Sequence, residues 1–161
     1  MSEINEFSRD LVKRQIDVYN EYKSKKYDMT QPLSVLICCS IILFSDYLEK
    51  NGKNSLIEEI KKNDITGKLQ KIIITIYDGK LNKRIKNHQF LNEELKEYEV
   101  FFHDLRNEFA HLIETNKSRM KPNDGSFSEI IITNGNIETH ITKKQIKELI
   151  EMIDKLISKS K

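Results

Sequence analysis

The sequence predicts a mainly α fold, a bundle of four to six helices, with one β-hairpin near residues 129–141. Apolar residues recur at helical spacing through most of the chain, and an Asn-Gly dipeptide separates two β-rich runs near the carboxyl end. The chain has 161 residues, and two domains sharing that length would each have a marginal core. We therefore predict one domain spanning residues 1–161.

Five segments carry apolar stripes of helical period, and a polar residue, Pro or Gly stands near several of their ends. They cover residues 3–26, 33–48, 69–77, 92–115 and 143 to the carboxyl end. Thr30 is a plausible cap for the second segment, and Asn51-Gly52 stops it. The fourth segment has the most regular stripe, with Asn92 as its cap. Its apolar residues are Leu95, Tyr98, Phe102, Leu105, Phe109 and Leu112. One face of that helix is predicted to be core.

Asn134-Gly135 is the strongest turn signal in the chain, because this dipeptide favours a two-residue hairpin loop. With that turn, Ile132 faces Ile137. Glu129 faces His140 on the other side of the hairpin, so His140 is predicted to be an exposed, paired histidine. The polar stretch 117–126, before the hairpin, is predicted to be a loop.

The net charge excludes a nucleic-acid binder that works by bulk positive charge alone. Lys and Arg number 27 against 25 acidic residues, for a net charge of +2, so bulk positive charge cannot attract phosphate and any such contact needs a local patch. The amino terminus lacks a basic start followed by an apolar run, and the apolar stretch 33–44 is too short to cross a bilayer. We expect a cytoplasmic protein without membrane contact.

The two cysteines, Cys38 and Cys39, are adjacent within that apolar stretch, which favours a role as small core residues. The sequence contains no Cys/His spacing typical of zinc and no Gly-rich phosphate loop. We predict neither a metal nor a cofactor.

The candidate chemistry lies on the fourth helix. His103, Asn107 and His111 recur every four residues, with Arg106 beside Asn107, and helix geometry places them roughly opposite the apolar stripe. That outer face also carries three apolar residues, which favours cover by another helix from this chain or from an identical subunit. These residues are Val100, Phe101 and Ala110. We predict a homodimer formed through this face.

The run Leu105-Arg106-Asn107-Glu108-Phe109-Ala110-His111 resembles the signature of HEPN domains, in which Arg is followed by a polar residue and then, after three more residues, by His. The helical organisation of the chain resembles that family loosely, and the motif resembles it closely. The resemblance implies a single HEPN-like helical domain. It also implies a metal-independent endoribonuclease, commonly a bacterial toxin or antiviral defence protein, whose active site forms where two domains meet.

The chemistry of RNA agrees with this implication. RNA is cleaved through its own 2′-hydroxyl when a base, an acid and positive charge at the phosphate are present. By the resemblance, Arg106 and His111 are catalytic, and a two-fold dimer supplies His111 once as base and once as acid. Asn107 is placed to orient the imidazole or to hold a phosphate oxygen. His103, Lys117 and Arg119 are candidates for substrate binding.

Two other readings stay open. The chain could be a HEPN-like module that binds a nucleotide or a protein without cleaving, or a helical interaction protein in which Arg106 and either Asp104 or Glu108 decorate a solvated face. Some family members paired with a nucleotidyltransferase carry a modified Tyr two residues after the motif His, where this chain has Ile113. Partners under the leading hypothesis are RNA, a second copy of the chain, and an antitoxin or another defence protein. Arg84 and His88 nearly match the motif spacing, and we give them no role.

Overall fold

The computed structural model describes residues 3–22, 30–114, 122–123, 126–127, 129–134 and 137–158, without the side chains of residues 3–5, 22, 30, 31, 33, 108–114, 122–130, 134 and 158. The described part of the chain contains seven α-helices, a 3-10 turn and four strands. In chain order these are α1 (Glu3–Tyr22), α2 (Thr30–Glu49), α3 (Leu56–Asn63), α4 (Lys68–Tyr77), α5 (Leu81–Lys86), η1 (Glu93–Leu95), α6 (Lys96–Glu114), β1 (Pro122–Asn123), β2 (Ser126–Phe127), β3 (Glu129–Asn134), β4 (Ile137–Thr142) and α7 (Lys143–Ser158).

The mainly α fold with a hairpin near residues 129–141 is confirmed. All five predicted helices are present. Two further helices, α3 and α5, are only 8 and 6 residues long, which is too short for hydrophobic periodicity to reveal them. A second antiparallel pair, β1 with β2, lies in the segment predicted as a loop and extends one residue past it, to Phe127.

Local chemistry explains where the central helices begin and end. Asn51 and Gly52 have positive φ angles of 50° and 74°, and Gly52 N donates to Tyr47 O at 2.8 Å, so this pair ends α2 as predicted. Asn92 Oδ1 accepts from Glu94 N at 3.0 Å and caps the turn that leads into α6. Thr30 is already the first residue of α2 rather than the residue before it.

The last helix begins with a reciprocal cap. Gln145 N donates to Thr142 Oγ1 at 3.3 Å, and Thr142 N donates to Gln145 Oε1 at 2.9 Å. This capping box satisfies two backbone donors that the first turn of α7 leaves open. It confirms Thr142 as the predicted cap and fixes the point at which the hairpin passes into α7.

The predicted register of the hairpin is wrong by two residues. Ile132 lies opposite Thr139, and Asn134 lies opposite Ile137, so the two residues between the paired positions are Gly135 and Asn136. A shift of two keeps the same faces inward, which is why hydrophobic alternation does not distinguish the two registers. His140 accordingly faces Ile131 instead of Glu129. Its Nε2 lies 2.9 Å from Oε1 of Glu138, on its own strand.

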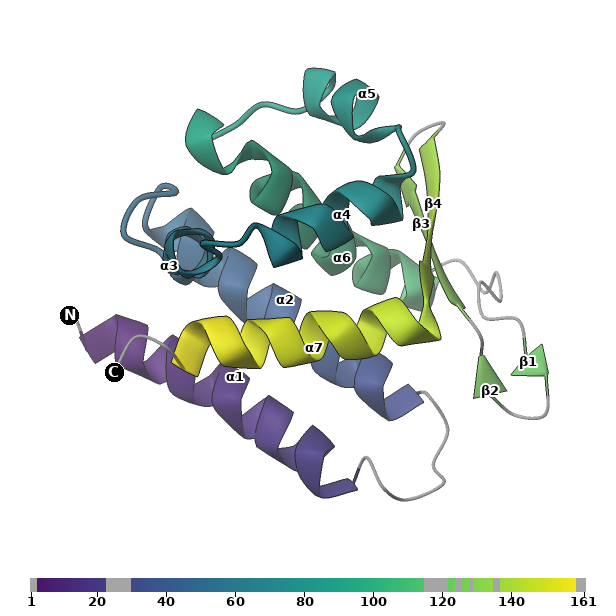
Figure 1. Ribbon diagram of the computed structural model, residues 1–161, viewed down its shortest axis with the longest axis horizontal. Helices are drawn as coiled ribbons and strands as arrows, with labels where there is room; N and C mark the ends of the chain where they lie inside the picture. The colour runs from purple at the N-terminus through teal and green to yellow at the C-terminus, as the bar shows by residue number, and fades with distance from the viewer. Residues whose placement is uncertain are drawn as a thin grey trace.

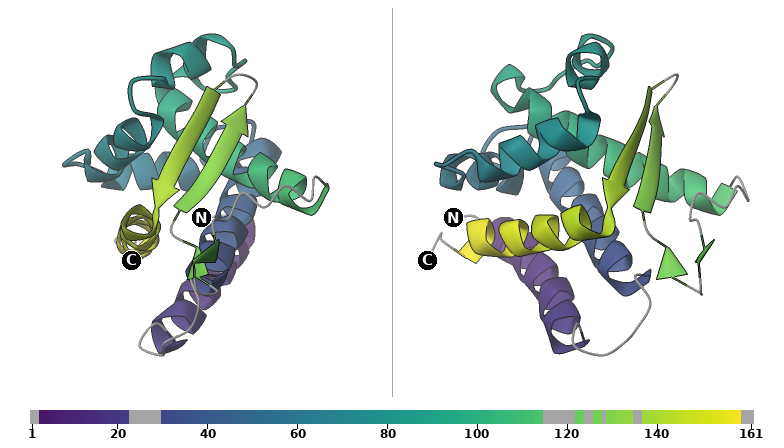
Figure 2. Two further views of the ribbon diagram at one scale, coloured as in Figure 1. Left: turned by 90° about the vertical axis from the view of Figure 1, so that its right-hand side faces the viewer. Right: turned by 45° about the vertical axis from the view of Figure 1, so that its right-hand side comes forward.

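The helices pack in a bundle around α2 and α6. In Figure 1, α7 lies across the front, with α1 below it and α4 above it, while the hairpin closes one end. The turned views in Figure 2 show the same hairpin standing across the bundle beside α6. Helix α2 contacts α1, α3, α6 and α7, and α6 contacts α2, α3, α4, α5 and β3. The buried apolar residues of all these helices form one cluster.

The central position of α6 overturns one argument for a dimer. Val100 and Phe101 are fully buried within the chain itself, because α6 is covered by neighbouring helices on more than one side. They are not available to a second subunit. The side chain of Ala110 lies outside the described residues. The homodimer therefore remains a prediction without this support.

A buried carboxylate joins α4 to α6. Asp64 accepts hydrogen bonds from Leu69 N at 3.2 Å, Gln70 N at 3.0 Å and Tyr98 Oη at 3.0 Å. It therefore satisfies donors at the amino end of α4 while it holds a tyrosine of α6. This contact sets the position of α4, whose last residue, Tyr77, enters the site described below.

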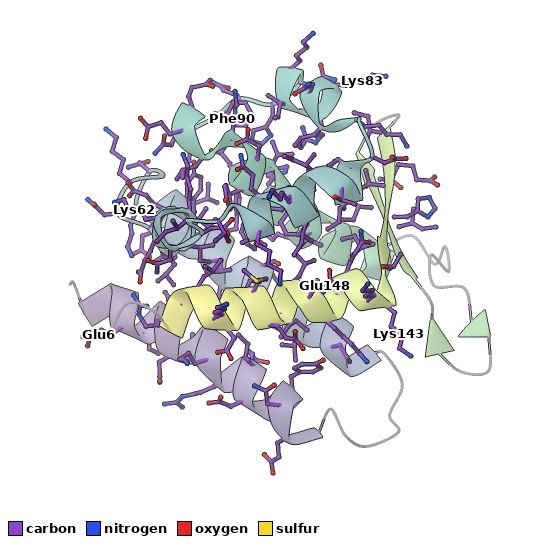
Figure 3. All side chains as sticks on the ribbon, in the orientation of Figure 1. Glu6, Lys62, Lys83, Phe90, Lys143 and Glu148 are labelled. Atoms are coloured by element: carbon purple, nitrogen blue, oxygen red, sulfur yellow. The ribbon has the colours of Figure 1, made fainter. Side chains whose placement is uncertain are left out.

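Cys39 is buried, and burial raises the pKa of its thiol to about 12, as expected for a core residue. Cys38 is half-buried, and both thiols are free. Charged side chains cover the outside of the bundle, among them the labelled Lys62, Lys83 and Lys143 in Figure 3. No helix among the described residues combines the length and apolar character needed to cross a membrane.

Candidate functional site

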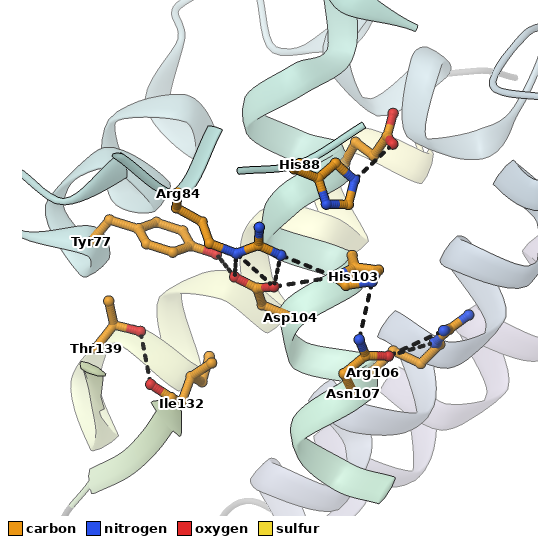
Figure 4. Close-up of polar contacts among 10 residues, drawn as sticks. Tyr77, Arg84, His88, His103, Asp104, Arg106, Asn107, Ile132 and Thr139 are labelled. Atoms are coloured by element: carbon orange, nitrogen blue, oxygen red, sulfur yellow. Dashed lines mark hydrogen bonds and ion pairs between the residues drawn. The ribbon is translucent and has the colours of Figure 1, made fainter. Parts of the chain in front are cut away.

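The polar face of α6 lies at the junction of four helices. Tyr47 and Phe44 approach it from α2, and Tyr77 approaches from the end of α4. Arg84 of α5 and His88, just after α5, complete the surround. Figure 4 shows Tyr77, Arg84 and His88 around His103 and Asp104, with Arg106 and Asn107 on the same helix. The site is therefore built by packing of α2, α4 and α5 against α6.

Asp104 is the buried centre of the site, with its side chain only 1% exposed. Arg84 Nη2 donates to its Oδ1 at 2.7 Å and Arg84 Nε to its Oδ2 at 3.0 Å. Tyr77 Oη donates to Oδ2 at 2.8 Å. The side chain of Arg84 is 4% exposed, so the two charges form a buried ion pair. The reading that Asp104 decorates a solvated face is wrong, because α4 and α5 cover that side of α6.

The surroundings of Asp104 keep it ionised. Burial by itself would raise its pKa, but hydrogen bonds from His103 and Arg84, together with the charge of Arg84, hold that pKa below its ordinary value of 3.8. The pKa of Tyr77 moves the other way and lies well above 10.0, because the phenol is buried beside this carboxylate. At neutral pH the phenol is thus a neutral donor to an anion.

Arg106 fixes the orientation of Asn107. Its Nε and Nη2 donate to Asn107 Oδ1 at 3.3 and 3.1 Å, and its guanidinium carbon lies 4.7 Å from the centre of the Phe44 ring. Because a guanidinium has donors only, it binds the amide oxygen of Asn107 and turns the amide nitrogen toward His103. The stacking on Phe44 restricts the motion of the guanidinium.

The orientation of Asn107 assigns the proton on His103. Asn107 Nδ2 donates to His103 Nε2 at 3.0 Å, so Nε2 accepts, and the neutral ring carries its proton on Nδ1. Nδ1 then donates to Asp104 Oδ1 at 3.2 Å. Arg84 Nη2 also lies 3.4 Å from Nδ1, but in this tautomer both atoms are donors, so we assign the bond of Nδ1 to Asp104. A buried carboxylate that orients an imidazole in this way is a common feature of catalytic histidines.

A second imidazole lies against the first. The rings of His88 and His103 have centroids 4.9 Å apart and planes at 68°. His88 Nε2 lies 3.1 Å from Oε1 of Glu99, a buried residue of α6. Tyr47 Oη donates to the other oxygen of Glu99. Burial and this carboxylate raise the pKa of the Tyr47 phenol, so it stays neutral.

The structure brings three of the predicted site residues together, and the side chains of the others lie outside the described residues. His103, Arg106 and Asn107 lie together, half-buried, on one side of α6. The described contacts of Asn107 are to Arg106 and His103. The backbone of His111 belongs to α6, one helical turn after Asn107, while its side chain lies outside the described residues. Lys117 and Arg119 also lie outside them.

The residues that the sequence analysis left without a role come mostly from outside the motif. Arg84 and His88 carried one usable signal, their near match to the motif spacing. Glu99 stands between buried Tyr98 and Val100, and an acid inside an apolar run is a second signal of a buried polar contact. Tyr47 and Tyr77 show no such signal, because a tyrosine on a helix stripe resembles any other core aromatic.

No known family model matches the chain, and no curated protein or solved structure is significantly similar to it. Among the described residues, no three His, Cys, Asp or Glu side chains are grouped as metal ligands. Arguments about function therefore depend on the site residues themselves.

Proposed function

We propose that the protein is a metal-independent endoribonuclease of the HEPN type, with Arg106, Asn107 and His111 of α6 as its motif residues. The observation that carries this proposal is the set of contacts made by the guanidinium of Arg106. Its guanidinium is half-buried, fixed by Phe44 and Asn107, and makes no salt bridge with a described carboxylate. A guanidinium that is held in place in this way is suited to bind a phosphate oxygen.

A single helix contains the backbones of all three motif residues. Helix α6 is continuous from Lys96 to Glu114, so the backbones of Arg106 and His111 lie within one and a half turns of each other. In the proposed reaction, one imidazole removes the proton of the RNA 2′-hydroxyl and another protonates the leaving 5′-oxygen. Arg106 stabilises the charge that develops on the phosphate. The attacking oxygen belongs to the substrate, so the reaction needs no metal-bound water.

The partners are part of the proposal. RNA is the substrate, and a homodimer brings two copies of His111 to one phosphate. A toxin or antiviral defence protein of the cytoplasm, held in check by an antitoxin or another defence partner, is the biological role that the HEPN resemblance favours. Lys117 and Arg119 follow α6 directly and are proposed to bind the RNA backbone.

One observation favours the non-catalytic alternative, a HEPN-like module that binds a nucleotide or a protein. The described polar atoms of Asn107 and His103 bond to each other and to their neighbours, an arrangement that also suits a fixed recognition surface. RNA cleavage separates the two functions.

The test is cleavage of labelled single-stranded RNA by the purified protein in the presence of a chelator. We expect products with a 2′,3′-cyclic phosphate, and a loss of about a hundredfold or more in rate for Arg106→Ala and for His111→Ala. Arg14→Ala and His140→Ala are matched controls, because these side chains are 73% and 43% exposed and lie on α1 and β4, away from the site.

Two outcomes would contradict the proposal in different ways. Full activity of His111→Ala would rule out the motif mechanism, whereas no cleavage of any RNA by the unmodified protein would favour the binding module. A monomer by light scattering, with an unchanged rate per chain on dilution, would remove the two-subunit site.

A further inference from the structure

The pairing of His88 with His103 is the least expected feature of the site. The two residues are 15 positions apart, His88 in the segment after α5 and His103 in α6, yet their rings contact each other edge to face, with centroids 4.9 Å apart. Each imidazole has a buried carboxylate of its own: Glu99 for His88 and Asp104 for His103. A single chain thus contains two adjacent imidazoles, each oriented by an acid.

Both rings reach the surface. The side chain of His88 is 13% exposed and that of His103 is 22% exposed, whereas both carboxylates are buried. His88 donates from Nε2 to Glu99, and within the described part of the chain its Nδ1 makes no hydrogen bond. Nδ1 of His88 and Nε2 of His103 are therefore the two ring nitrogens that accept protons.

The formal charges of the described residues around the pair cancel. Glu99 and Asp104 contribute two negative charges, and Arg84 and Arg106, which bonds to Asn107 beside His103, contribute two positive ones. The phenols of Tyr47 and Tyr77, which bond to the two carboxylates from α2 and α4, stay neutral. With both imidazoles neutral the site has no net charge. A phosphodiester carries one negative charge, which one proton on the pair neutralises.

Two protons on the pair are disfavoured, because two imidazolium rings in contact repel each other in a half-buried site. When only one ring carries the extra proton, that ring is an acid and its neighbour is a base. Cleavage through a 2′-hydroxyl needs one group of each kind.

We propose that His88 and His103 form a phosphate-binding acid–base pair within one chain, beside the guanidinium of Arg106. This inference rests on the proposed ribonuclease function for its reaction. In this inference the acid and the base are two imidazoles of one chain, in place of two copies of His111, so the two-subunit site proposed above becomes the alternative that the variants test.

The reaction balances with the single proton of the pair. The neutral imidazole takes the proton of the 2′-hydroxyl, and O2′ forms a bond to phosphorus while the bond from phosphorus to O5′ breaks. O5′ takes the proton of the imidazolium and leaves as a 5′-hydroxyl. The products are a 2′,3′-cyclic phosphate and a 5′-hydroxyl end, and the pair again holds one proton, now on the other ring. Substrate replaces the amide of Asn107 at Nε2 of His103.

The first test needs no variant in the site. The histidine ring signals of the unmodified protein are followed by NMR against pH, with and without inorganic phosphate or a single-stranded 2′-deoxy oligonucleotide, which binds but cannot be cleaved. We expect the ring signals of both His88 and His103 to shift when phosphate is added. His140, paired with Glu138 on the hairpin, serves as the internal control and should not shift. Phosphate that moves neither signal of the pair would overturn the proposal.

The second test compares cleavage by His88→Gln, His103→Gln and the control His140→Gln. An amide preserves hydrogen bonding but does not titrate, so each site variant should lose about a hundredfold or more in kcat/KM and one limb of its pH–rate profile. The double variant should lose far less than the product of the two single losses, because the rings act as a unit.

The outcomes separate this inference from the proposed function. If both Gln variants keep their activity while His111→Ala is inactive, the pair is not the acid–base pair and the ribonuclease stands. If phosphate shifts both signals and no RNA is cleaved, the ribonuclease fails and the phosphate site stands. Thermal unfolding of each variant identifies any loss that comes from misfolding.

Discussion

Replacement of Arg84 by Met tests how far the buried polar contacts stabilise the fold. Arg84→Met keeps most of the apolar stem of the side chain and removes the guanidinium, leaving the carboxylate of Asp104 buried without its counter-ion. Both side chains are almost fully inaccessible, at 4% and 1% exposed, so solvent does not screen the lost interaction. Breaking a buried ion pair from one side costs about 3–5 kcal/mol.

The remaining partners of Asp104 reduce that cost. Tyr77 and His103 still donate to the carboxylate, and hydrogen bonds to a charged group contribute about 1.5–3 kcal/mol each. We therefore expect a loss near the lower end of the range, about 3 kcal/mol, in the free energy of unfolding. Against a total of about 5–15 kcal/mol for a domain, this is a large fraction.

The measurement is urea-induced unfolding followed by circular dichroism at 222 nm, with Lys83→Met as the control. Lys83 is an exposed neighbour on α5, and its replacement should change stability by no more than about 0.5 kcal/mol. The double variant Arg84→Met/Asp104→Asn removes the stranded charge and should recover about 1–2 kcal/mol relative to Arg84→Met alone. A loss below about 1 kcal/mol for Arg84→Met, or a double variant less stable than Arg84→Met, would refute the reasoning.

Two further predictions follow from the same region. Gly52→Ala should lower the free energy of unfolding by about 1–3 kcal/mol, because a Cβ there would lie 2.8 Å from Tyr47 Oη at a φ of +74°. The control Gly79→Ala has a similar φ and no atom within 4 Å of its Cβ, so it should lower that free energy clearly less. Equal losses for the two variants would exclude the clash with Tyr47. The lowered pKa of Asp104 should make stability pH-dependent in acid. The native carboxylate binds its proton at lower pH than the unfolded one, so its contribution is complete above 3.8 and is lost as the pH falls through the lower native pKa. Between about pH 2 and 5, the free energy of unfolding should change less steeply with pH for Asp104→Asn than for the unmodified protein. An unchanged slope would contradict the lowered pKa of Asp104.

The helices and the hairpin were predictable because their signals are local. Stripes at helical spacing located five helices, and Asn92, Thr142 and Asn51-Gly52 marked boundaries through hydrogen bonds that span only a few residues. The motif residues Arg106 and Asn107 were placed on the same side of one helix for the same reason. Helices α3 and α5 were not predicted, because so few turns carry no clear period.

The composition of the site was decided by tertiary packing. Arg84 and Asp104 are 20 positions apart, and Tyr47 and Glu99 are 52 apart, so no period or motif within one segment relates them. Packing of α2, α4 and α5 around α6 brought these residues together, buried Val100 and Phe101, and placed Asp104 in the interior. It also joined His88 to His103. The sequence by itself determined which residues lie on each side of α6, because that depends only on helical spacing. The neighbouring helices determined which of these residues are buried, that the buried Asp104 stays ionised, and that His103 contacts a second imidazole.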